Sequence, residues 1–285
     1  MYGNWLLDRF GGMRVAVIGD VLLDQFVECA PRKLCSEGPV PVVWRQGEVV
    51  APGGAANVAA NLAGLGARVS LVSVVGRDDA GRRLRKALEE RGVPGDLLLA
   101  EPASSTHRKT RILAGGQYVV RVDDGETARP GRRLRVAIER ALGDADAVVL
   151  SDYGLGVLDD RTIGWLAAHR PAAPTIVDAK RPARFRRVRP TAVTPNLDEA
   201  TALAGDGQPE RVARRIRRAT GAEIVALTLG SRGAYVLDGD GTDELLPARP
   251  GPAESDVGAG DSFAAALALG LGAGAGARQA AAVAV

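Results

Sequence analysis

Residues 256–263 read Asp-Val-Gly-Ala-Gly-Asp-Ser-Phe and run directly into the Ala- and Leu-rich stretch Ala264–Leu271. A glycine-rich turn that opens a helix is typical of an anion site, because Gly258 and Gly260 let the backbone approach a ligand and the first helical N–H groups lack partners. Asp261 in this turn would repel a phosphate, but it is well placed to take a proton from an attacking hydroxyl. The stretch therefore predicts phosphoryl transfer to an alcohol. Taken alone, it is equally consistent with an ordinary helix start whose glycines serve packing.

Apolar runs that read as buried strands alternate with helical segments along most of the chain. The strand-like runs are Arg14–Ile18, Val69–Val75, Ala145–Leu150, Thr175–Val177, Ala192–Thr194 and Ile224–Leu229. The helical segments are Ala55–Leu65, Ala80–Arg91, Arg132–Leu142, Arg161–Ala168 and Pro209–Thr220. This alternation predicts one α/β domain over residues 1–285, with helices on both faces of a mostly parallel sheet and ligands at the carboxyl ends of its strands.

Two segments break this alternation. Residues 21–50 and 106–122 alternate apolar and polar positions without a helical period, and Gly115-Gly116 provides a turn inside the second segment. They predict a small β-sheet inserted into the α/β core. The residues alone leave open whether it moves or is only a fixed edge hairpin.

The composition argues against several classes of protein. The net charge is +3, but only four of the 37 basic residues are lysines, and the arginines cluster beside acidic residues in helical segments, as on solvated helix faces. We therefore expect no nucleic-acid partner. Cys29 and Cys35 fit neither a zinc pattern nor a disulfide framework. No apolar run is long enough to span a bilayer, so we expect a cytoplasmic protein without a membrane partner.

Further motifs occur in a fixed order before the glycine-rich turn. They are Gly19-Asp20 with Asp24, Gly53-Gly54-Ala55-Ala56-Asn57, Thr194-Pro195-Asn196-Leu197-Asp198-Glu199, and Thr228-Leu229-Gly230 with Gly233. Together they resemble the ribokinase-like sugar kinases, also called the PfkB family, over residues 13–285. The resemblance implies a ribokinase-like three-layer α/β/α core. It also implies that the small β-sheet is a lid over the sugar and the surface of a homodimer.

Three shorter stretches narrow the resemblance. Residues 39–43, 106–123 and 151–156, the last reading Ser-Asp-Tyr-Gly-Leu-Gly, resemble the heptose 7-phosphate kinase branch, which is the kinase half of bifunctional heptose kinase/adenylyltransferases. This branch implies ATP- and Mg²⁺-dependent phosphorylation of O1 of D-glycero-β-D-manno-heptose 7-phosphate. The alternatives are a related kinase of ribose, fructose or a fructose phosphate, and a non-catalytic nucleotide- or sugar-binding protein. A dinucleotide-binding dehydrogenase is disfavoured because the first strand is not followed by the glycine fingerprint.

The glycine-rich turn and the nucleotide side supply the first group of candidate site residues. We expect Asp261 to be the general base and the N–H groups of Gly258, Ala259 and Gly260 to form an anion hole. The candidate nucleotide-side residues are Lys180, Asn196, Glu199, Thr228, Gly230 and Gly233.

The Asn196–Glu199 element has two interpretations. The resemblance implies that Glu199 holds Mg²⁺ through water and that Asn196 contacts phosphate. From the residues alone, the same pair is equally typical of a helix N-cap and its N3 partner. Just before the glycine-rich turn, Ser255-Asp256-Val257 departs from the family pattern, because the family commonly has a threonine there.

The acceptor side supplies the second group of candidates. These are Asp20, Asp24, Gly53, Gly54, Asn57, Lys109, Arg111, Arg121 and Asp152. Carboxylates and amides recognise pairs of hydroxyls, and the two glycines allow close approach of the backbone. The three cations alternate along the predicted small sheet, and such a cluster suits an acceptor that already carries a phosphate.

The end of the chain predicts a helix over Ala264–Leu271, a loop at Gly272-Ala273-Gly274, and a second helix over Ala277–Val285 without a cap. We expect the chain to be cut short there. The resemblance implies further residues that help to enclose the adenine.

Overall fold

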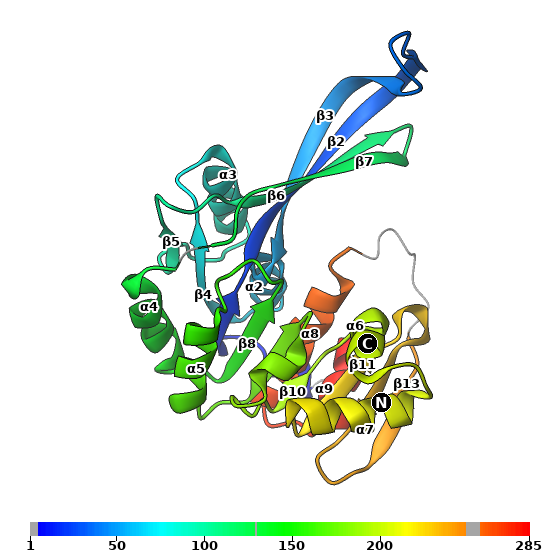
Figure 1. Ribbon diagram of the computed structural model, residues 1–285. Helices are drawn as coiled ribbons and strands as arrows, with labels where there is room; N and C mark the ends of the chain where they lie inside the picture. Colours follow the sequence, from blue (N-terminus) through cyan, green and yellow to red (C-terminus); the bar gives the residue numbers. More distant parts are fainter. Residues whose placement is uncertain (1–4, 129, 249–256) are drawn as a thin grey trace.

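A nine-stranded sheet forms the centre of the protein, as a computed structural model describing residues 5–128, 130–248 and 257–285 shows (Figure 1). The strand order is β13-β12-β11-β10-β9-β8-β1-β4-β5. The parallel strands are β1 (Arg14–Gly19), β4 (Arg68–Val75), β5 (Leu98–Ala100), β8 (Ala147–Asp152), β9 (Thr175–Ala179), β10 (Ala192–Val193) and β11 (Ile224–Thr228). The antiparallel strands β12 (Ala234–Leu237) and β13 (Asp243–Leu246) complete one edge. The prediction of a mostly parallel sheet is confirmed.

Helices cover both faces of this sheet and make the fold three-layered. One face carries α1 (Trp5–Asp8), α2 (Ala55–Gly64), α3 (Asp79–Glu89), α8 (Ala259–Gly272) and α9 (Ala277–Ala284). The other carries α4 (Arg132–Leu142), α5 (Asp160–Ala168), α6 (Leu197–Ala204), α7 (Pro209–Thr220) and the 3₁₀ turn η1 (Pro182–Phe185). In β1, Val15 and Val17 pack into the first layer while Ala16 and Ile18 pack into the second. A strand buried on both faces therefore reads as one continuous apolar run.

A second sheet, which we call the arm, projects from this body as a long twisted ribbon (Figure 1). It consists of β3 (Pro41–Gly54), β2 (Val21–Leu34), β6 (His107–Ala114) and β7 (Gln117–Asp124), in that spatial order. Only β2 and β6 pair in parallel; the other two pairs are antiparallel. These strands cover the two segments predicted as an inserted sheet. Among the described residues, no helix combines the length and the apolar character that crossing a membrane requires.

Candidate active site

A cavity of about 270 Å³ opens where the carboxyl ends of β8, β9 and β11 meet the start of α8. Ligands of open α/β sheets bind at this edge, because the loops after the strands converge there. Its lining comprises Asp152, Tyr153, Asp178, Ala179, Lys180, Thr194, Asn196, Glu199, Thr228, Gly258, Gly260 and Asp261. The predicted catalytic turn and most of the predicted nucleotide-side residues therefore share one cavity. Gly230 begins the 3₁₀ turn η2 (Gly230–Arg232) just beyond β11, Gly233 follows this turn, and neither belongs to the lining.

Asp261 lies in the first turn of α8, and both of its carboxylate oxygens are held. The side-chain amide of Asn57 donates to Oδ2 at 2.8 Å, and the hydroxyl of Tyr153 donates to Oδ1 at 2.9 Å. Gly258, with φ of 86°, precedes the helix, and a Cβ there would lie 2.5 Å from Nδ2 of Asn57. Only glycine therefore lets α2, which carries Asn57, approach the start of α8 this closely.

Burial raises the pKa of Asp261 to about 6. The negative charge of Asp24 acts in the same direction, whereas the hydrogen bonds from Asn57 and Tyr153 and the charge of Lys109 oppose it. A carboxylate with this pKa is mostly ionised at neutral pH and is more basic than an exposed aspartate. Asp261 is therefore suited to accept a proton from a hydroxyl group.

Two further carboxylates concentrate negative charge in the same cavity. Asp178 at the end of β9 accepts a hydrogen bond from Thr194 Oγ1 at 3.0 Å. Burial, together with the charges of Asp261 and Glu199, raises the pKa of Asp178 to about 7. Burial also raises the pKa of Glu199. Within the described residues no three His, Cys, Asp or Glu side chains are grouped closely enough to hold a metal directly. A cation that keeps most of its own waters, as Mg²⁺ does, fits this arrangement.

Asn196 and Glu199 form a reciprocal capping box at the start of α6. Asn196 Oδ1 accepts from the backbone N–H of Glu199 at 2.9 Å, and Glu199 Oε2 accepts from the backbone N–H of Asn196 at 3.0 Å. The helix cap that the residues alone left open is therefore present. Both side chains also line the cavity, so the cap orients Glu199 beside it.

Two lysines flank the aromatic ring of Tyr153. Lys109 Nζ, from the arm, lies 5.7 Å from the ring centroid, and Lys180 Nζ, after β9, lies 5.8 Å from it. Burial lowers the pKa of Lys109, the charge of Asp24 opposes this, and the charge of Lys180 adds to it. In the described parts of the chain, Lys109 makes no ion pair within 4.0 Å. It therefore brings an uncompensated positive charge from the arm toward the cavity.

Arg111 and Arg121 differ from the free cations that we expected. Arg111 forms an ion pair with Asp24 in which each side chain is only 11% exposed, and its guanidinium stacks over Phe26 at 5.1 Å. Arg121 is exposed and pairs with Asp123 at 2.9 Å. The strand register places Arg121 opposite Arg111, so the three predicted cations do share one face of the arm. The guanidinium of Arg111, however, is already committed to Asp24.

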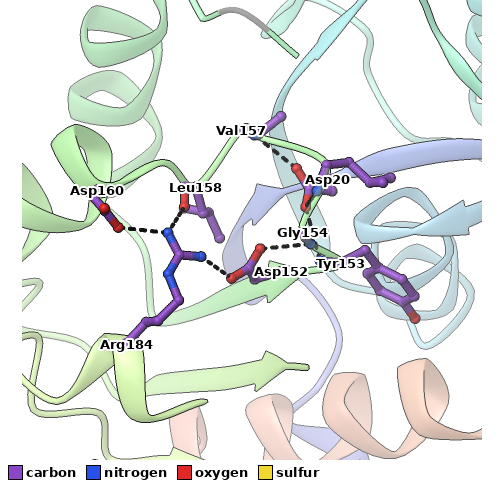
Figure 2. Close-up of polar contacts among 9 residues, drawn as sticks. Asp20, Asp152, Tyr153, Gly154, Val157, Leu158, Asp160 and Arg184 are labelled. Carbon is purple, nitrogen blue, oxygen red and sulfur yellow. Dashed lines mark hydrogen bonds and ion pairs between the residues drawn. The ribbon is translucent and has the colours of Figure 1, made fainter. Parts of the chain in front are cut away.

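Asp20 and Asp152 also have partners other than a ligand, as Figure 2 shows. The Asp20 side chain is fully buried and accepts from the backbone N–H groups of Tyr153, Leu155 and Val157 at 2.8–2.9 Å. Asp152 accepts from the N–H of Gly154 at 3.0 Å and pairs with Arg184 at 2.8 Å. Buried carboxylates need such partners. Our expectation that Asp20 faces the sugar therefore needs correction, because its carboxylate binds the backbone of the loop after β8 instead.

Gly53 and Gly54 end β3 beside these groups. A Cβ at Gly54 would lie 2.5 Å from the carbonyl oxygen of Asp20, and a Cβ at Gly53 would collide with the carboxylate of Asp24. These glycines thus bring the start of α2, with Asn57, next to the roots of β1 and β2. Asp24, Asn57, Lys109 and Asp261 consequently gather at one place, whereas Ser255 and Asp256 lie outside the described residues.

The prediction did not include three residues of this neighbourhood: Tyr153, Asp178 and Arg184. Tyr153 and Asp178 follow apolar runs that end at the carboxyl edge of the sheet, and this position was the available signal for both. Arg184 lies in a basic connection and reaches Asp152 only through the tertiary fold, so nothing local marks it.

The chain matches the family model described as pfkB family carbohydrate kinase over residues 13–285. It is 38% identical over 269 residues to bifunctional protein HldE of Caulobacter vibrioides, covering 90% of this chain and 55% of that protein. A second HldE, from Halorhodospira halophila, is also 38% identical over 269 residues, covering 91% of this chain and 55% of the relative. The chain thus spans about half the length of the curated relatives it matches.

Solved structures show the same fold. The Arabidopsis thaliana ribokinase complexed with ribose and ATP has a TM-score of 0.76 and 20% identity, covering 95% of this chain and 89% of that one. The Escherichia coli phosphofructokinase-2 in complex with substrates and products has a TM-score of 0.73 and 21% identity, covering 94% and 89%. The chain therefore belongs to the pfkB family of carbohydrate kinases, phosphotransferases that act on a sugar hydroxyl.

Proposed function

We propose that this chain uses ATP and Mg²⁺ to phosphorylate O1 of D-glycero-β-D-manno-heptose 7-phosphate, giving the 1,7-bisphosphate. The observation that carries the proposal is the buried Asp261, whose two carboxylate oxygens both accept hydrogen bonds. This residue lies at a glycine-rich helix N-terminus of the kind that binds phosphate, and it is close to Lys109 of the arm. The heptose assignment is supported by the resemblance of residues 39–43, 106–123 and 151–156 and by the similarity to HldE proteins.

In this proposal Asp261 takes the proton of the acceptor hydroxyl as that oxygen attacks the γ-phosphorus of ATP, and the bond from this phosphorus to the β–γ bridging oxygen breaks to release ADP. The backbone N–H groups of Gly258, Ala259 and Gly260 receive the charge that spreads over the transferred phosphoryl oxygens. No covalent enzyme intermediate is needed, so catalysis rests on alignment and charge stabilisation. The closely packed α2 and α8 provide the required rigidity.

The nucleotide side of the cavity supplies charges of both signs. We propose that Glu199 and Asp178 hold Mg²⁺ through its water ligands, and that the bound ion neutralises phosphate charge. Asn196 and Thr228 line the same wall, where they would contact the nucleotide phosphates together with Lys180. Gly230 and Gly233 lie at the turn after β11, where the nucleotide base would extend beyond the cavity.

The acceptor side has Asp24 and Asn57 for the sugar hydroxyls and Lys109 for the distal phosphate. Lys109 is the best phosphate ligand of the three predicted cations, because Arg111 is neutralised by Asp24 and Arg121 by Asp123. Arg121 is exposed, so it remains able to exchange its partner for a phosphate. A lone ammonium at this position would be superfluous for a neutral sugar.

We also propose that the arm is the lid of this site and the surface of a homodimer. All eight residues of β7 are exposed, and this strand is an edge of the arm. Tyr118, Val120 and Val122 on it, and Trp44 on β3, are 61, 46, 45 and 65% exposed. Exposed apolar side chains on an unpaired strand edge favour pairing with another sheet.

A panel of acceptors tests the proposed function directly. ADP release would be measured with the heptose 7-phosphate, the unphosphorylated heptose, ribose, fructose and fructose 6-phosphate at saturating MgATP. We expect the highest kcat/KM for the heptose 7-phosphate. A preference for ribose or fructose would overturn the heptose assignment while keeping the kinase, and binding without turnover of any sugar would overturn the catalytic assignment.

A further inference from the structure

Tyr153 contacts the arm, the body and the proposed base. Its hydroxyl donates to Asp261 Oδ1 at 2.9 Å, and its ring packs 3.4 Å from where a Cβ at Gly54 would lie. Lys109 of the arm and Lys180 of the body both place their ammonium groups within 6 Å of its ring centroid. Movement of Tyr153 would therefore change its contacts with Asp261 and with both lysines.

The loop that carries Tyr153 is clamped by two buried carboxylates. Asp20 accepts three backbone N–H groups from residues 153, 155 and 157, and Asp152 accepts the N–H of Gly154 (Figure 2). Arg184 locks Asp152 in turn, and also donates to the carbonyl of Leu158 and to Asp160. Residues 153–158 are mostly buried or half-buried, with only Gly154 exposed, and these bonds pair carboxylates that would cost free energy if they were buried without partners. The result is a fixed position for the Tyr153 backbone.

We propose that Tyr153 is a positioning residue, whose hydroxyl fixes the orientation of the Asp261 carboxylate and whose ring seats Lys109 beside the acceptor. The inference rests on the proposed role of Asp261 as the base. With Asn57 on one oxygen and Tyr153 on the other, the carboxylate cannot rotate about its Cβ–Cγ bond without losing a hydrogen bond. Loss of the Tyr153 hydroxyl frees that rotation.

The same hydrogen bond also affects the basicity of Asp261. The groups that face this carboxylate are Asp24 from β2, Lys109 from β6, Asp178 from β9, Asn57 from α2 and Tyr153 itself. Tyr153 and Asn57 stabilise the ionised form by donating to it. Removal of the Tyr153 hydroxyl should therefore move the pKa of Asp261 above its value of about 6.

Tyr153→Phe tests the hydroxyl with almost no change of shape. We expect kcat to fall about 10-fold or more, because the lost hydrogen bond is to a charged group, while KM for MgATP stays constant. The acid limb of the kcat/KM profile should move to higher pH. Tyr235→Phe is the matched control, because Tyr235 faces the carboxylate of Asp243 on the distant β12–β13 edge and should leave kcat and the pH profile unchanged.

Tyr153→Leu tests the ring as well. We expect it to lower kcat like Tyr153→Phe and, in addition, to raise KM for the sugar phosphate about 2- to 5-fold, the contribution typical of an exposed cation–π contact. Equal KM values for the Phe and Leu variants would overturn the part of the proposal that concerns Lys109.

A titration without substrate separates this inference from the proposed function. The ¹³C carboxyl resonances of labelled aspartates would be followed against pH in the wild type and in Tyr153→Phe, with Asp261→Asn used to assign the Asp261 signal. We expect a higher pKa for Asp261 in Tyr153→Phe and no change in Tyr235→Phe. An unchanged Asp261 pKa together with an unchanged kcat would overturn the inference even if Asp261→Asn is inactive. Full activity of Asp261→Asn would overturn the proposed base and, with it, the positioning role.

Discussion

The guanidinium of Arg111 lies 2.5 Å from the carboxylate of Asp24, and each of the two side chains is only 11% exposed. This pair joins β6 to β2 at the base of the arm. It removes Arg111 from the pool of cations that could bind a phosphate and leaves Lys109, two residues earlier on the same strand, to do so. The distinction between these neighbours can be measured.

Lys109→Ala should raise KM for a phosphorylated sugar about 10- to 150-fold, since a charge-assisted hydrogen bond is lost. KM for the same sugar without its phosphate should change little. Steady-state kinetics with both sugars make the comparison, and equal losses for the two would refute a phosphate-binding role of Lys109.

Arg111→Ala should behave differently, because it leaves the buried carboxylate of Asp24 without its partner. We expect a loss of about 3–5 kcal/mol in the free energy of unfolding, as is typical when one half of a buried pair is removed. The effect on KM should be similar for phosphorylated and unphosphorylated sugars. Urea unfolding and the same kinetic comparison check this, with Arg111→Lys as the variant that keeps the charge; selective loss toward the phosphorylated sugar would restore Arg111 as a phosphate ligand.

Asp261→Asn should reduce kcat on the order of 100- to 10,000-fold, because the amide cannot accept the proton. Its shape is conserved, so Kd values for nucleotide and sugar should stay within a few-fold of wild type. Steady-state assays of ADP release give kcat, and isothermal titration calorimetry gives the Kd values. A variant that keeps more than about a tenth of the wild-type kcat shows that another group is the base.

Activity should depend on pH through Asp261. A general base must be ionised, and the pKa of this carboxyl is raised to about 6, so kcat/KM for the sugar should be flat at higher pH and fall as pH drops through about 6. The measurement needs saturating MgATP, because the pKa of Asp178 is raised to about 7 and its protonation would weaken Mg²⁺ binding separately. An acid limb near pH 4 would mean that the environment of Asp261 does not control the rate.

The cap and metal roles of α6 can be separated by two variants. Glu199→Gln keeps an oxygen that accepts from the N–H of Asn196 but loses the charge, so it should raise the Mg²⁺ concentration needed for half-maximal activity with little loss of stability. Asn196→Ala removes the cap and should cost about 1 kcal/mol of stability. Thermal unfolding and Mg²⁺ titrations distinguish the two, and an unchanged Mg²⁺ requirement in Glu199→Gln would leave Glu199 with the cap alone.

Much of this architecture could be predicted from local sequence. α4 and α7 have the predicted bounds, and six of the seven parallel strands lie within two residues of the predicted apolar runs, whereas the short strand β5 was not predicted. These elements can be recognised because burial on both faces makes a strand apolar throughout, while the apolar residues of an amphipathic helix recur with the helical period. By contrast, α8 begins at Ala259 rather than Ala264, since the glycine-rich turn continues directly into the helix.

The pairing of charges could not be predicted in the same way. Arg111 and Asp24 are 87 residues apart, and Arg184 and Asp152 are 32 apart, so only the fold determines that they meet. Asp20 looked like a ligand because it ends a strand at the ligand-binding edge, yet its carboxylate faces the backbone of the next loop. Sequence locates polar residues at an edge, but partners decide which of them remain free for a substrate.

The two roles proposed for the arm can be separated because β2 runs as one strand from the buried base of the arm to its exposed far end. Val21–Gln25 are buried, whereas residues 31–34 near the far end are exposed. A β-ribbon that is held at its base bends so that the displacement is large at its tip and small at its base. Asp24 and its register partner Lys109 lie at the root, and the connection at residues 35–40 lies at the tip. Replacing residues 35–40 with a different loop should therefore change which protein the arm binds and leave the affinity for the sugar unchanged.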